Sequence, residues 1–276
     1  MLASGQSTAN VGLFHCAASV IKMPGMNKND NALILTAGHC MDEGSKVLPR
    51  GGWRTPDVGE ILYNKKVARK RFILYSPGGN PLKAYYAGDG YYDHILLATM
   101  TGYDLAVFNS NISYAQMERK GVPVYQVATS LPKQTSPLIF TLWKDAHKLD
   151  LTCRVYQIVA QVREADWQFK NMIKLHQDID DCGFRRGFSG AGSVDLKKQL
   201  IYGVASTAFS GGTPCEYDNP CEVDVHSRAI STALPQQVYA TPAYVLLGCW
   251  DRKNKRFNVD QKQCLISKEA NASRKQ

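Results

Sequence analysis

Hydrophobic residues come in short runs along the whole chain, and residues that favour turns end each run. The segment Ser76-Pro77-Gly78-Gly79-Asn80-Pro81 is typical of what separates them. Short apolar runs bounded by Gly, Pro, Asn and Asp indicate β-strands. The predicted strands are 11–14, 32–37, 61–63, 72–75, 95–100, 105–108, 124–128, 138–143, 151–159, 192–195 and 200–205. So many short strands predict an all-β fold, a sandwich or a barrel.

Helical periodicity is scarce. The exception is residues 235–247, a candidate late helix that Pro242 would kink or shorten. A soft boundary lies at 129–137, where Ser, Pro, Lys and Gln interrupt the strands. The polar tail, 268–276, is expected to be frayed.

The composition fits a folded protein. The chain has 276 residues, of which 44% are hydrophobic, and this is enough for a sizeable core. No apolar run is long enough to span a membrane. Residues 1–10 are polar and lack the pattern of a signal peptide, so we expect a mature form of the protein.

The formal net charge is +9, and the basic residues gather in two clusters. Neither cluster interleaves aromatic residues as a nucleic-acid-binding module does. We interpret both as solvated surface and expect no nucleic-acid partner. The clusters are Lys65, Lys66, Arg69, Lys70 and Arg71, and Arg252, Lys253, Lys255 and Arg256.

The chain contains eight cysteines, an even number, and no close Cys-x-x-Cys pair. The common zinc-binding spacings are therefore missing. Disulfides are the favoured interpretation, and they predict an oxidising location, secreted or periplasmic.

His39 is the first residue with a chemical signature. It lies in Leu35-Thr36-Ala37-Gly38-His39-Cys40, directly after a predicted strand. A histidine can act as a general base at neutral pH because its ordinary pKa is about 6.5. A single histidine is more often structural, so this motif gains weight only from others.

Ser189 lies in a glycine-rich segment, Gly187-Phe188-Ser189-Gly190-Ala191-Gly192. Glycines allow a tight turn that exposes a serine hydroxyl and aims backbone N–H groups at a developing oxyanion. Such a segment can also be an ordinary loop.

Asp104 opens the strongly apolar strand 105–108. A buried carboxylate there needs a partner, and an imidazole N–H would satisfy it. Asp93 also precedes an apolar strand and is the alternative acid.

Together, in the order His, Asp, Ser, these motifs resemble those of the trypsin-like (chymotrypsin-fold) serine peptidases. The family's Thr-Ala-x-His-Cys signature is matched by Thr36, Ala37, His39 and Cys40, and its Asp-hydrophobic-Ala strand by Asp104, Leu105 and Ala106. Its Gly-x-Ser-Gly loop is matched by Gly187, Ser189 and Gly190. The resemblance covers roughly residues 10 to 245.

The resemblance implies two six-stranded antiparallel β-barrels with the catalytic cleft between them and a short C-terminal helix. The expected units are 10–128, which carries His39 and Asp104, 129–250, which carries Ser189, and an extension at 251–276. Ser189 would be the nucleophile, His39 the base and Asp104 its partner, with the amides of Gly187 and Ser189 as the oxyanion hole.

The resemblance also implies a disulfide between Cys16 and Cys40, beside the catalytic histidine. By spacing we pair the others, although sequence does not fix connectivity. These pairs are Cys153 with Cys182, Cys215 with Cys221, and Cys249 with Cys264.

Two positions depart from the family pattern. Phe188 stands where digestive enzymes carry an Asp that pairs with a freed N-terminus, and Ala191 replaces a glycine. Activation by that pairing is therefore not expected. In this respect the chain is more similar to the bacterial-type and glutamyl-endopeptidase branch.

The residues expected to bind substrate are Gly183, Phe184, Ser206, Thr207 and Ala208. By the resemblance, Gly183 stands at the position of the pocket base, where trypsin-like enzymes that select Lys or Arg carry an Asp. Ala205 stands where glutamyl endopeptidases carry a His. The preferred cleavage residue therefore stays open.

Other interpretations fit the motifs less well. An α/β-hydrolase would use Asp224 and His226 after the serine, but alternating strands and helices are missing. A catalytically silent trypsin-like fold that binds without cutting is the runner-up.

One polar cluster could suggest a Ca²⁺ site, but we interpret it as a polar loop. It consists of His176, Asp178, Asp180 and Asp181. We expect no metal, no cofactor, a monomer, and protein or peptide substrates.

Overall fold

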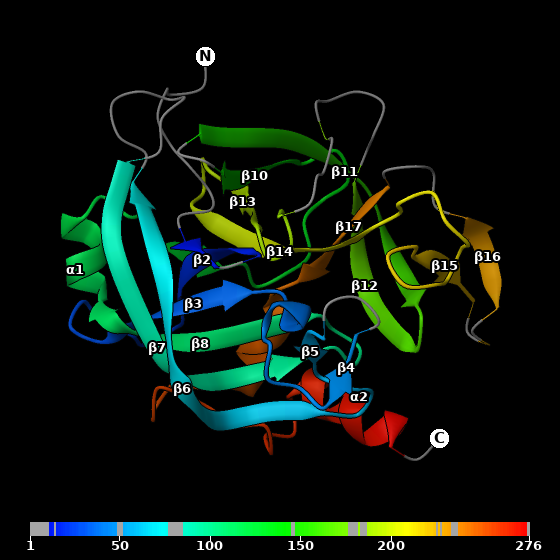
Figure 1. The fold of residues 1–276 in the computed structure, drawn as a ribbon, viewed down its shortest axis with the longest axis horizontal. Coiled ribbons are helices and arrows are strands. Elements are labelled where there is room, and N and C mark those ends of the chain that lie inside the picture. The colour runs from blue at the N-terminus through cyan, green and yellow to red at the C-terminus, as the bar shows by residue number, and fades with distance from the viewer. Residues whose placement is uncertain are drawn as a thin grey trace.

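The computed structural model describes residues 11–13, 15–48, 52–76, 85–144, 147–175, 182, 187–224, 226, 228–232 and 237–274. Strands dominate this part of the chain, and its α-helices are short (Figure 1). The prediction of an all-β fold is confirmed.

Six strands of the first half form a sheet whose first and last strands also pair with each other. The pairing order is β1-β6-β7-β8-β3-β2, all antiparallel, and β1 also pairs with β2, so that the order returns to its start. The strands are β1 (Val11–Gly12), β2 (Ala17–Lys22), β3 (Asn31–Thr36), β6 (Ile61–Ser76), β7 (Tyr85–Thr99) and β8 (Leu105–Ser113).

Six strands of the second half pair in the same way. Their order is β14-β13-β10-β11-β12-β17, and β17 pairs back with β14. The strands are β10 (Pro137–Lys144), β11 (His147–Glu164), β12 (Trp167–Leu175), β13 (Gly192–Asp195), β14 (Leu200–Ala208) and β17 (Val238–Pro242). Figure 1 shows β6 and β7 in cyan at one side and β11 and β12 in green at the other.

Shorter elements connect these two groups of strands or lie outside them. The strand β9 (Tyr125–Val127) pairs in parallel with both β2 and β14 and so links the two groups. The other elements are β4 (Lys46–Val47), β5 (Arg54–Thr55), β15 (Cys221–Val223), β16 (Ala229–Thr232), β18 (Trp250–Asp251), β19 (Arg256–Phe257), α1 (Tyr114–Arg119), α2 (Leu265–Ser273) and the 3₁₀ helices η1 (Gly38–Cys40) and η2 (Tyr244–Cys249).

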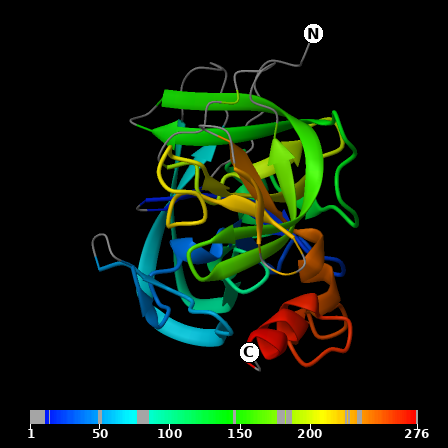
Figure 2. The same cartoon turned by 90° about the vertical axis from the view of Figure 1, so that its right-hand side faces the viewer.

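Each group of strands encloses buried hydrophobic side chains, because apolar residues on alternate positions face inward. The largest cluster fills the first group and also contains Leu246, Trp250 and Ile266 from the end of the chain. Residues beyond 242 therefore pack on the first half of the chain, although they follow the second half in sequence; α2 is drawn in red in Figure 2. The domain boundaries named from the sequence stay a prediction.

The prediction of a helix at 235–247 is wrong. Its described part is the strand β17 followed by the 3₁₀ helix η2. All five residues of β17 are buried between β12 and β14, and a strand buried on both faces has a continuous apolar run that periodicity cannot separate from a helix.

The tail expected to fray is instead helical, in α2, as far as Ser273. Ile266 and Ala270 are buried, and Glu269 pairs with Lys170 at 2.6 Å. The side chain of Arg274 donates a hydrogen bond to the carbonyl of Gly59 at 3.0 Å. These contacts hold the helix on the body of the protein.

All eight cysteines form disulfides, in the four pairs named from the sequence. The pairs are Cys16–Cys40, Cys153–Cys182, Cys215–Cys221 and Cys249–Cys264. Among the described residues no helix is both long and apolar enough to cross a membrane.

Candidate active site

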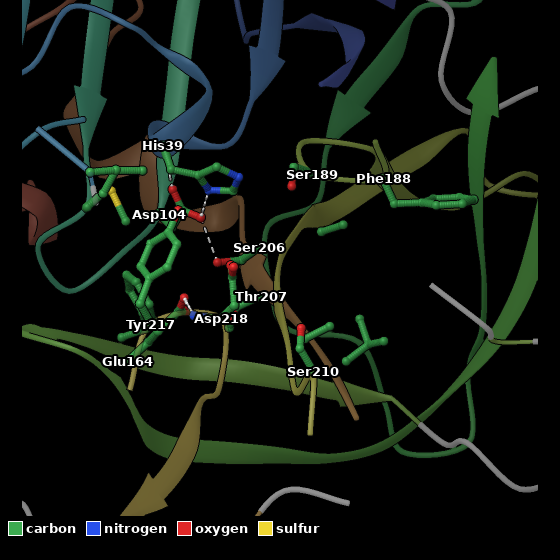
Figure 3. Close-up of a pocket in the computed structure, with 16 residues that line it drawn as sticks. His39, Asp104, Glu164, Phe188, Ser189, Ser206, Thr207, Ser210, Tyr217 and Asp218 are labelled. Atoms are coloured by element: carbon green, nitrogen blue, oxygen red, sulfur yellow. Dashed lines mark hydrogen bonds and ion pairs between the residues drawn. The ribbon is translucent and has the colours of Figure 1, made fainter. Parts of the chain in front are cut away.

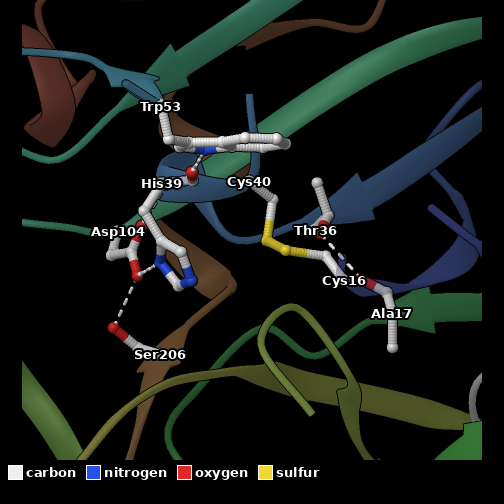
Figure 4. Close-up of a disulfide and its surroundings, with 8 residues drawn as sticks. All are labelled: Cys16, Ala17, Thr36, His39, Cys40, Trp53, Asp104 and Ser206. Carbon is white, nitrogen blue, oxygen red and sulfur yellow. Dashed lines mark hydrogen bonds and ion pairs between the residues drawn. A yellow bond between two sulfur atoms is a disulfide. The ribbon is translucent and has the colours of Figure 1, made fainter. Parts of the chain in front are cut away.

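His39 lies in the 3₁₀ turn η1, directly after the buried strand β3. Gly38 allows this turn to approach the end of β7: a Cβ there would lie 2.0 Å from the carbonyl oxygen of Thr99. The indole N–H of Trp53 donates to the carbonyl of His39 at 2.7 Å, and the Cys16–Cys40 disulfide ties the turn to β2 (Figure 4). The backbone of His39 is therefore fixed both at its own carbonyl and at the next residue, Cys40, and this fixes where the imidazole starts.

Asp104 precedes β8 and is only 1% exposed. Its Oδ1 accepts the backbone N–H of His39 at 2.9 Å, and its Oδ2 lies 2.7 Å from His39 Nδ1. The hydroxyl of Ser206 donates to the same Oδ2 at 2.7 Å (Figure 4). A buried carboxylate is costly unless it is hydrogen-bonded, and this one has three donors. The arrangement places the proton on Nδ1 and leaves Nε2 as a proton acceptor.

The opposite charges of His39 and Asp104 shift the pKa values of both side chains. Burial would raise the pKa of Asp104, but the charge of His39 and the hydrogen bonds from His39 and Ser206 outweigh it and hold the pKa below its usual range. Burial would lower the pKa of His39, but the carboxylate of Asp104 outweighs it and raises the pKa above its ordinary value. The carboxylate therefore stabilises the imidazolium more than water would, and imidazolium is the form that a histidine takes once it has accepted a proton as a general base.

Ser189 lies in a turn that the two glycines of the motif permit. Gly187 and Gly190 have φ values of 102° and 78°, in the region that favours glycine. The amide of Ala191 donates to the carbonyl of Phe188 at 2.8 Å and closes the turn. The sequence prediction of a tight turn at this serine agrees with the backbone.

The turn is docked on the first half of the chain. A Cβ on Gly190 would lie 2.0 Å from Oγ1 of Thr36 and 2.3 Å from the carbonyl oxygen of Ala17. The amide of Ala17 in turn donates to the carbonyl of Ser189 at 2.8 Å. Because Thr36 ends β3, only three residues before His39, this docking brings the serine segment to the histidine segment.

His39, Asp104 and Ser189 line one pocket, a cavity of about 280 Å³. In the view of Figure 3 the imidazole stands between Asp104 and Ser189. No hydrogen bond joins Ser189 to His39 in the described structure. Such bonds are often long in the absence of substrate and tighten when it binds.

The predicted oxyanion donors are the amides of Gly187 and Ser189. Within the described residues, neither amide has a hydrogen-bond acceptor. As far as the described residues show, both amides could bind a substrate oxygen that approaches the turn, and their role stays a prediction.

The residues expected to bind substrate are partly described. Ser206, Thr207 and Ala208 all line the pocket, and Ser206 also bonds Asp104; that they bind substrate stays a prediction. Gly183 and Phe184 lie outside the described residues, so the pocket base stays a prediction.

Phe188 packs into the core of the second half and is 1% exposed. In Figure 3 its ring extends away from Ser189. A buried phenyl ring cannot form an ion pair with a chain terminus. The turn is instead supported by hydrophobic packing and by the hydrogen bonds described above.

Other candidates from the sequence do not converge here. Asp93 is exposed and pairs with the neighbouring His94 at 2.8 Å, so the alternative acid is wrong. The all-β pairing excludes the α/β-hydrolase alternative. The four residues considered for a Ca²⁺ site, His176, Asp178, Asp180 and Asp181, lie outside the described residues.

One group in the described part has the spacing of metal ligands: Cys16, His39 and Cys40. Its two sulfurs are joined in a disulfide, so neither is a thiolate, the form that binds metals. This group is therefore a poor metal site.

Sequence reasoning missed several pocket residues, and one of them, Glu164, is ionisable and deeply buried. It is the last residue of β11, is 7% exposed and lines the pocket together with His39. No motif marks it, because an acidic residue near a hairpin tip is usually solvent-exposed.

No protein-family model matches the chain, and no curated protein matches it in sequence. Solved structures are similar to it at low identity. The protease domain of MamO from Magnetospirillum magneticum is 11% identical, over 90% of this chain and 97% of that one, with a TM-score of 0.49. A Glu endopeptidase is 15% identical, over 86% and 87%, with a TM-score of 0.46. The Nocardiopsis protease NAPase is 11% identical, over 91% and 97%, with a TM-score of 0.44. The chain is thus similar to three proteases over most of its length, at low identity.

Proposed function

We propose that the protein is a serine endopeptidase with Ser189 as nucleophile, His39 as general base and Asp104 as the group that orients and stabilises the imidazole. The observation that carries the proposal is the buried Asp104 carboxylate. It binds both Nδ1 and the backbone N–H of His39, at 2.7 and 2.9 Å, in a pocket that Ser189 also lines.

The chemistry follows from this arrangement. His39 Nε2 takes the proton of the Ser189 hydroxyl as the oxygen attacks the peptide carbonyl carbon. The tetrahedral intermediate then collapses: the imidazolium gives its proton to the leaving amine, and an acyl-enzyme forms on Ser189. Water, deprotonated by His39, attacks the acyl-enzyme, releases the carboxylic acid product and restores the serine.

Asp104 and the turn lower the barrier in different ways. The carboxylate stabilises the imidazolium that forms during each proton transfer, because it is buried and close to Nδ1. The amides of Gly187 and Ser189 would bind the negative oxygen of the intermediate, since no other group in the described part accepts their hydrogen bonds.

We also propose that the protein acts outside the cytoplasm, in a secreted or periplasmic location. All eight cysteines are oxidised to disulfides, and one of these disulfides joins the His39 turn to β2. Such bonds persist in oxidising compartments.

The test is hydrolysis of fluorescein-labelled casein by wild type, Ser189→Ala and His39→Ala. Wild type should cleave, and each variant should lose activity by about 10³-fold or more. Ser45→Ala is the control, because Ser45 is exposed and bonded to Glu60, and it should retain the wild-type rate. A Ser189→Ala protein that cleaves normally would overturn the proposal. A folded wild type that cleaves nothing would favour the binding-only alternative.

A further inference from the structure

Glu164 is a buried carboxyl group that the proposed mechanism does not use. It ends β11, at a hairpin tip, and its side chain reaches the pocket that His39 and Ser189 line (Figure 3). Only 7% of the residue is exposed. Acidic residues are almost never this buried unless they are paired, so its partners indicate its role.

Its partners come from two other walls of the pocket. The backbone N–H of Asp218 donates to Glu164 Oε1 at 2.9 Å. The side chain of Thr207, in β14, hydrogen-bonds the same carboxyl. One side chain thus joins the β11 hairpin, the strand that carries Ser206, and the segment around Asp218.

That segment is a small loop closed by the Cys215–Cys221 disulfide. It contributes Tyr217 and Asp218 to the pocket lining. Asp218 has a φ of 59°, an uncommon conformation for a residue with a side chain, and a hydrogen bond to its amide helps to hold it. Within the described residues, the Glu164 carboxyl is the acceptor for that amide.

Several ionisable groups face Glu164. They are His39 from η1, Asp218 from the disulfide loop and, in the same pocket, Asp104. Burial is the largest influence and raises the pKa of Glu164 to about 7, although the charge of His39 and the two hydrogen bonds lower it. The hydrogen bond to the Asp218 amide and the ionisation of the carboxyl are therefore two separate properties of Glu164. Glutamine keeps the first and removes the second, whereas alanine removes both.

We propose that Glu164 is a positioning residue of the substrate pocket: its carboxyl holds the Cys215–Cys221 loop against β14 and so fixes the wall that faces His39. The inference rests on the proposed peptidase function. It concerns substrate binding rather than the bond-breaking step, because Glu164 bonds the pocket wall and makes no hydrogen bond to His39 or Ser189 in the described structure.

The first test separates KM from kcat for labelled casein. Glu164→Ala removes the acceptor and should raise KM about tenfold, with kcat changed by less than about threefold. Glu164→Gln keeps an oxygen for the Asp218 amide and should restore KM to within about threefold of wild type. Equal KM values for wild type and Glu164→Ala would overturn the proposal, as would a Gln variant as impaired as the Ala variant.

The matched control is Glu222→Gln. Glu222 is also 7% exposed and lies beside Cys221, but it bonds Lys174 and Tyr239 and is absent from the pocket lining. Its loss should lower stability and leave KM unchanged. A KM rise in Glu222→Gln equal to that of Glu164→Ala would show a general effect of buried charge and contradict the proposal.

The second test does not depend on activity. Hydrogen–deuterium exchange of peptides covering residues 215–221 should show the Asp218 amide protected in wild type and Glu164→Gln and exchanging faster in Glu164→Ala. Unchanged exchange would refute the role of Glu164 even if the enzyme cleaves casein. If wild type cleaves nothing, the proposed function fails, while exchange still decides whether Glu164 holds the loop.

If Glu164→Ala does not fold, a double variant tests the same wall. Cys215→Ser with Cys221→Ser opens the loop and leaves Glu164 in place. It should raise KM by about tenfold, the same rise that we expect for Glu164→Ala. An unchanged KM would show that the loop does not position substrate.

Discussion

The buried carboxyl of Glu164 contributes to the pH dependence of the protein's stability, and Glu164→Gln should remove that contribution. The pKa of this carboxyl is about 7 in the folded protein, against an ordinary value of 4.5. A group whose pKa is raised on folding binds its proton more tightly in the native state. Its contribution to stability is therefore complete below about pH 4.5 and is lost as the pH rises toward about 7.

The magnitude follows from these two pKa values. Integrating the proton linkage from about pH 5 to about pH 8, ionisation of Glu164 should remove about 2.5 kcal/mol of the free energy of unfolding. Glutamine has nearly the same shape and does not ionise. The difference in stability between variant and wild type should therefore shift by this amount in favour of the variant as the pH rises.

Urea unfolding at the two pH values, with disulfides intact, measures this quantity. Wild type should lose about 2.5 kcal/mol more than Glu164→Gln between them. Other titrating groups cancel in the comparison to the extent that the substitution leaves them unchanged. Equal losses for the two proteins would refute the reasoning, because Glu164 would then titrate as an exposed carboxyl does.

Three further substitutions test other parts of the structure. Asp104→Asn should lower kcat/KM for labelled casein by about 10⁴-fold, because an amide favours the wrong tautomer of His39; a loss below about tenfold would contradict the assigned role. Gly190→Ala should destabilise the protein by about 2 kcal/mol or more in urea unfolding, since its Cβ would lie 2.0 Å from Thr36 Oγ1 at a positive φ. Unchanged stability would show that the turn does not dock as described. Cys16→Ala with Cys40→Ala should cost about 3 kcal/mol, because the disulfide closes a loop between residues 24 apart, and a cost below about 1 kcal/mol in the same assay would count against this.

The site residues could be identified from the sequence because their signals are local. The motif around His39 needs a strand end and a tight turn within a few residues, and Gly38 supplies the close approach to Thr99. The serine turn needs glycines at 187 and 190, and both have positive φ. In both cases the residues that meet these requirements lie within a few positions of the site residue, so the sequence contains them side by side.

Other features depend on contacts that no local pattern contains. β6 is one strand from Ile61 to Ser76, although the apolar pattern predicts only 61–63 and 72–75, because its basic middle pairs with β7 and remains largely at the surface. The same pattern does not reveal β12, because Lys170 and Lys174 interrupt its apolar residues. Both lysines find acidic partners far away in sequence, Glu269 and Glu222.

Glu164 shows the same limit at the site. Its burial depends on a hairpin tip, a disulfide loop and β14 meeting at one place. Each of these is unremarkable in sequence, so only the assembled fold reveals the carboxyl.

Labelling with a fluorophosphonate, followed by mass mapping of the modified peptide, tests the central claim most directly. The reagent phosphonylates a serine that a neighbouring base activates. We expect one adduct on wild type, located at Ser189, and no adduct on His39→Ala or Ser189→Ala. An adduct at another serine, or none on a folded wild type, would contradict the assignment of His39, Asp104 and Ser189 as a catalytic triad.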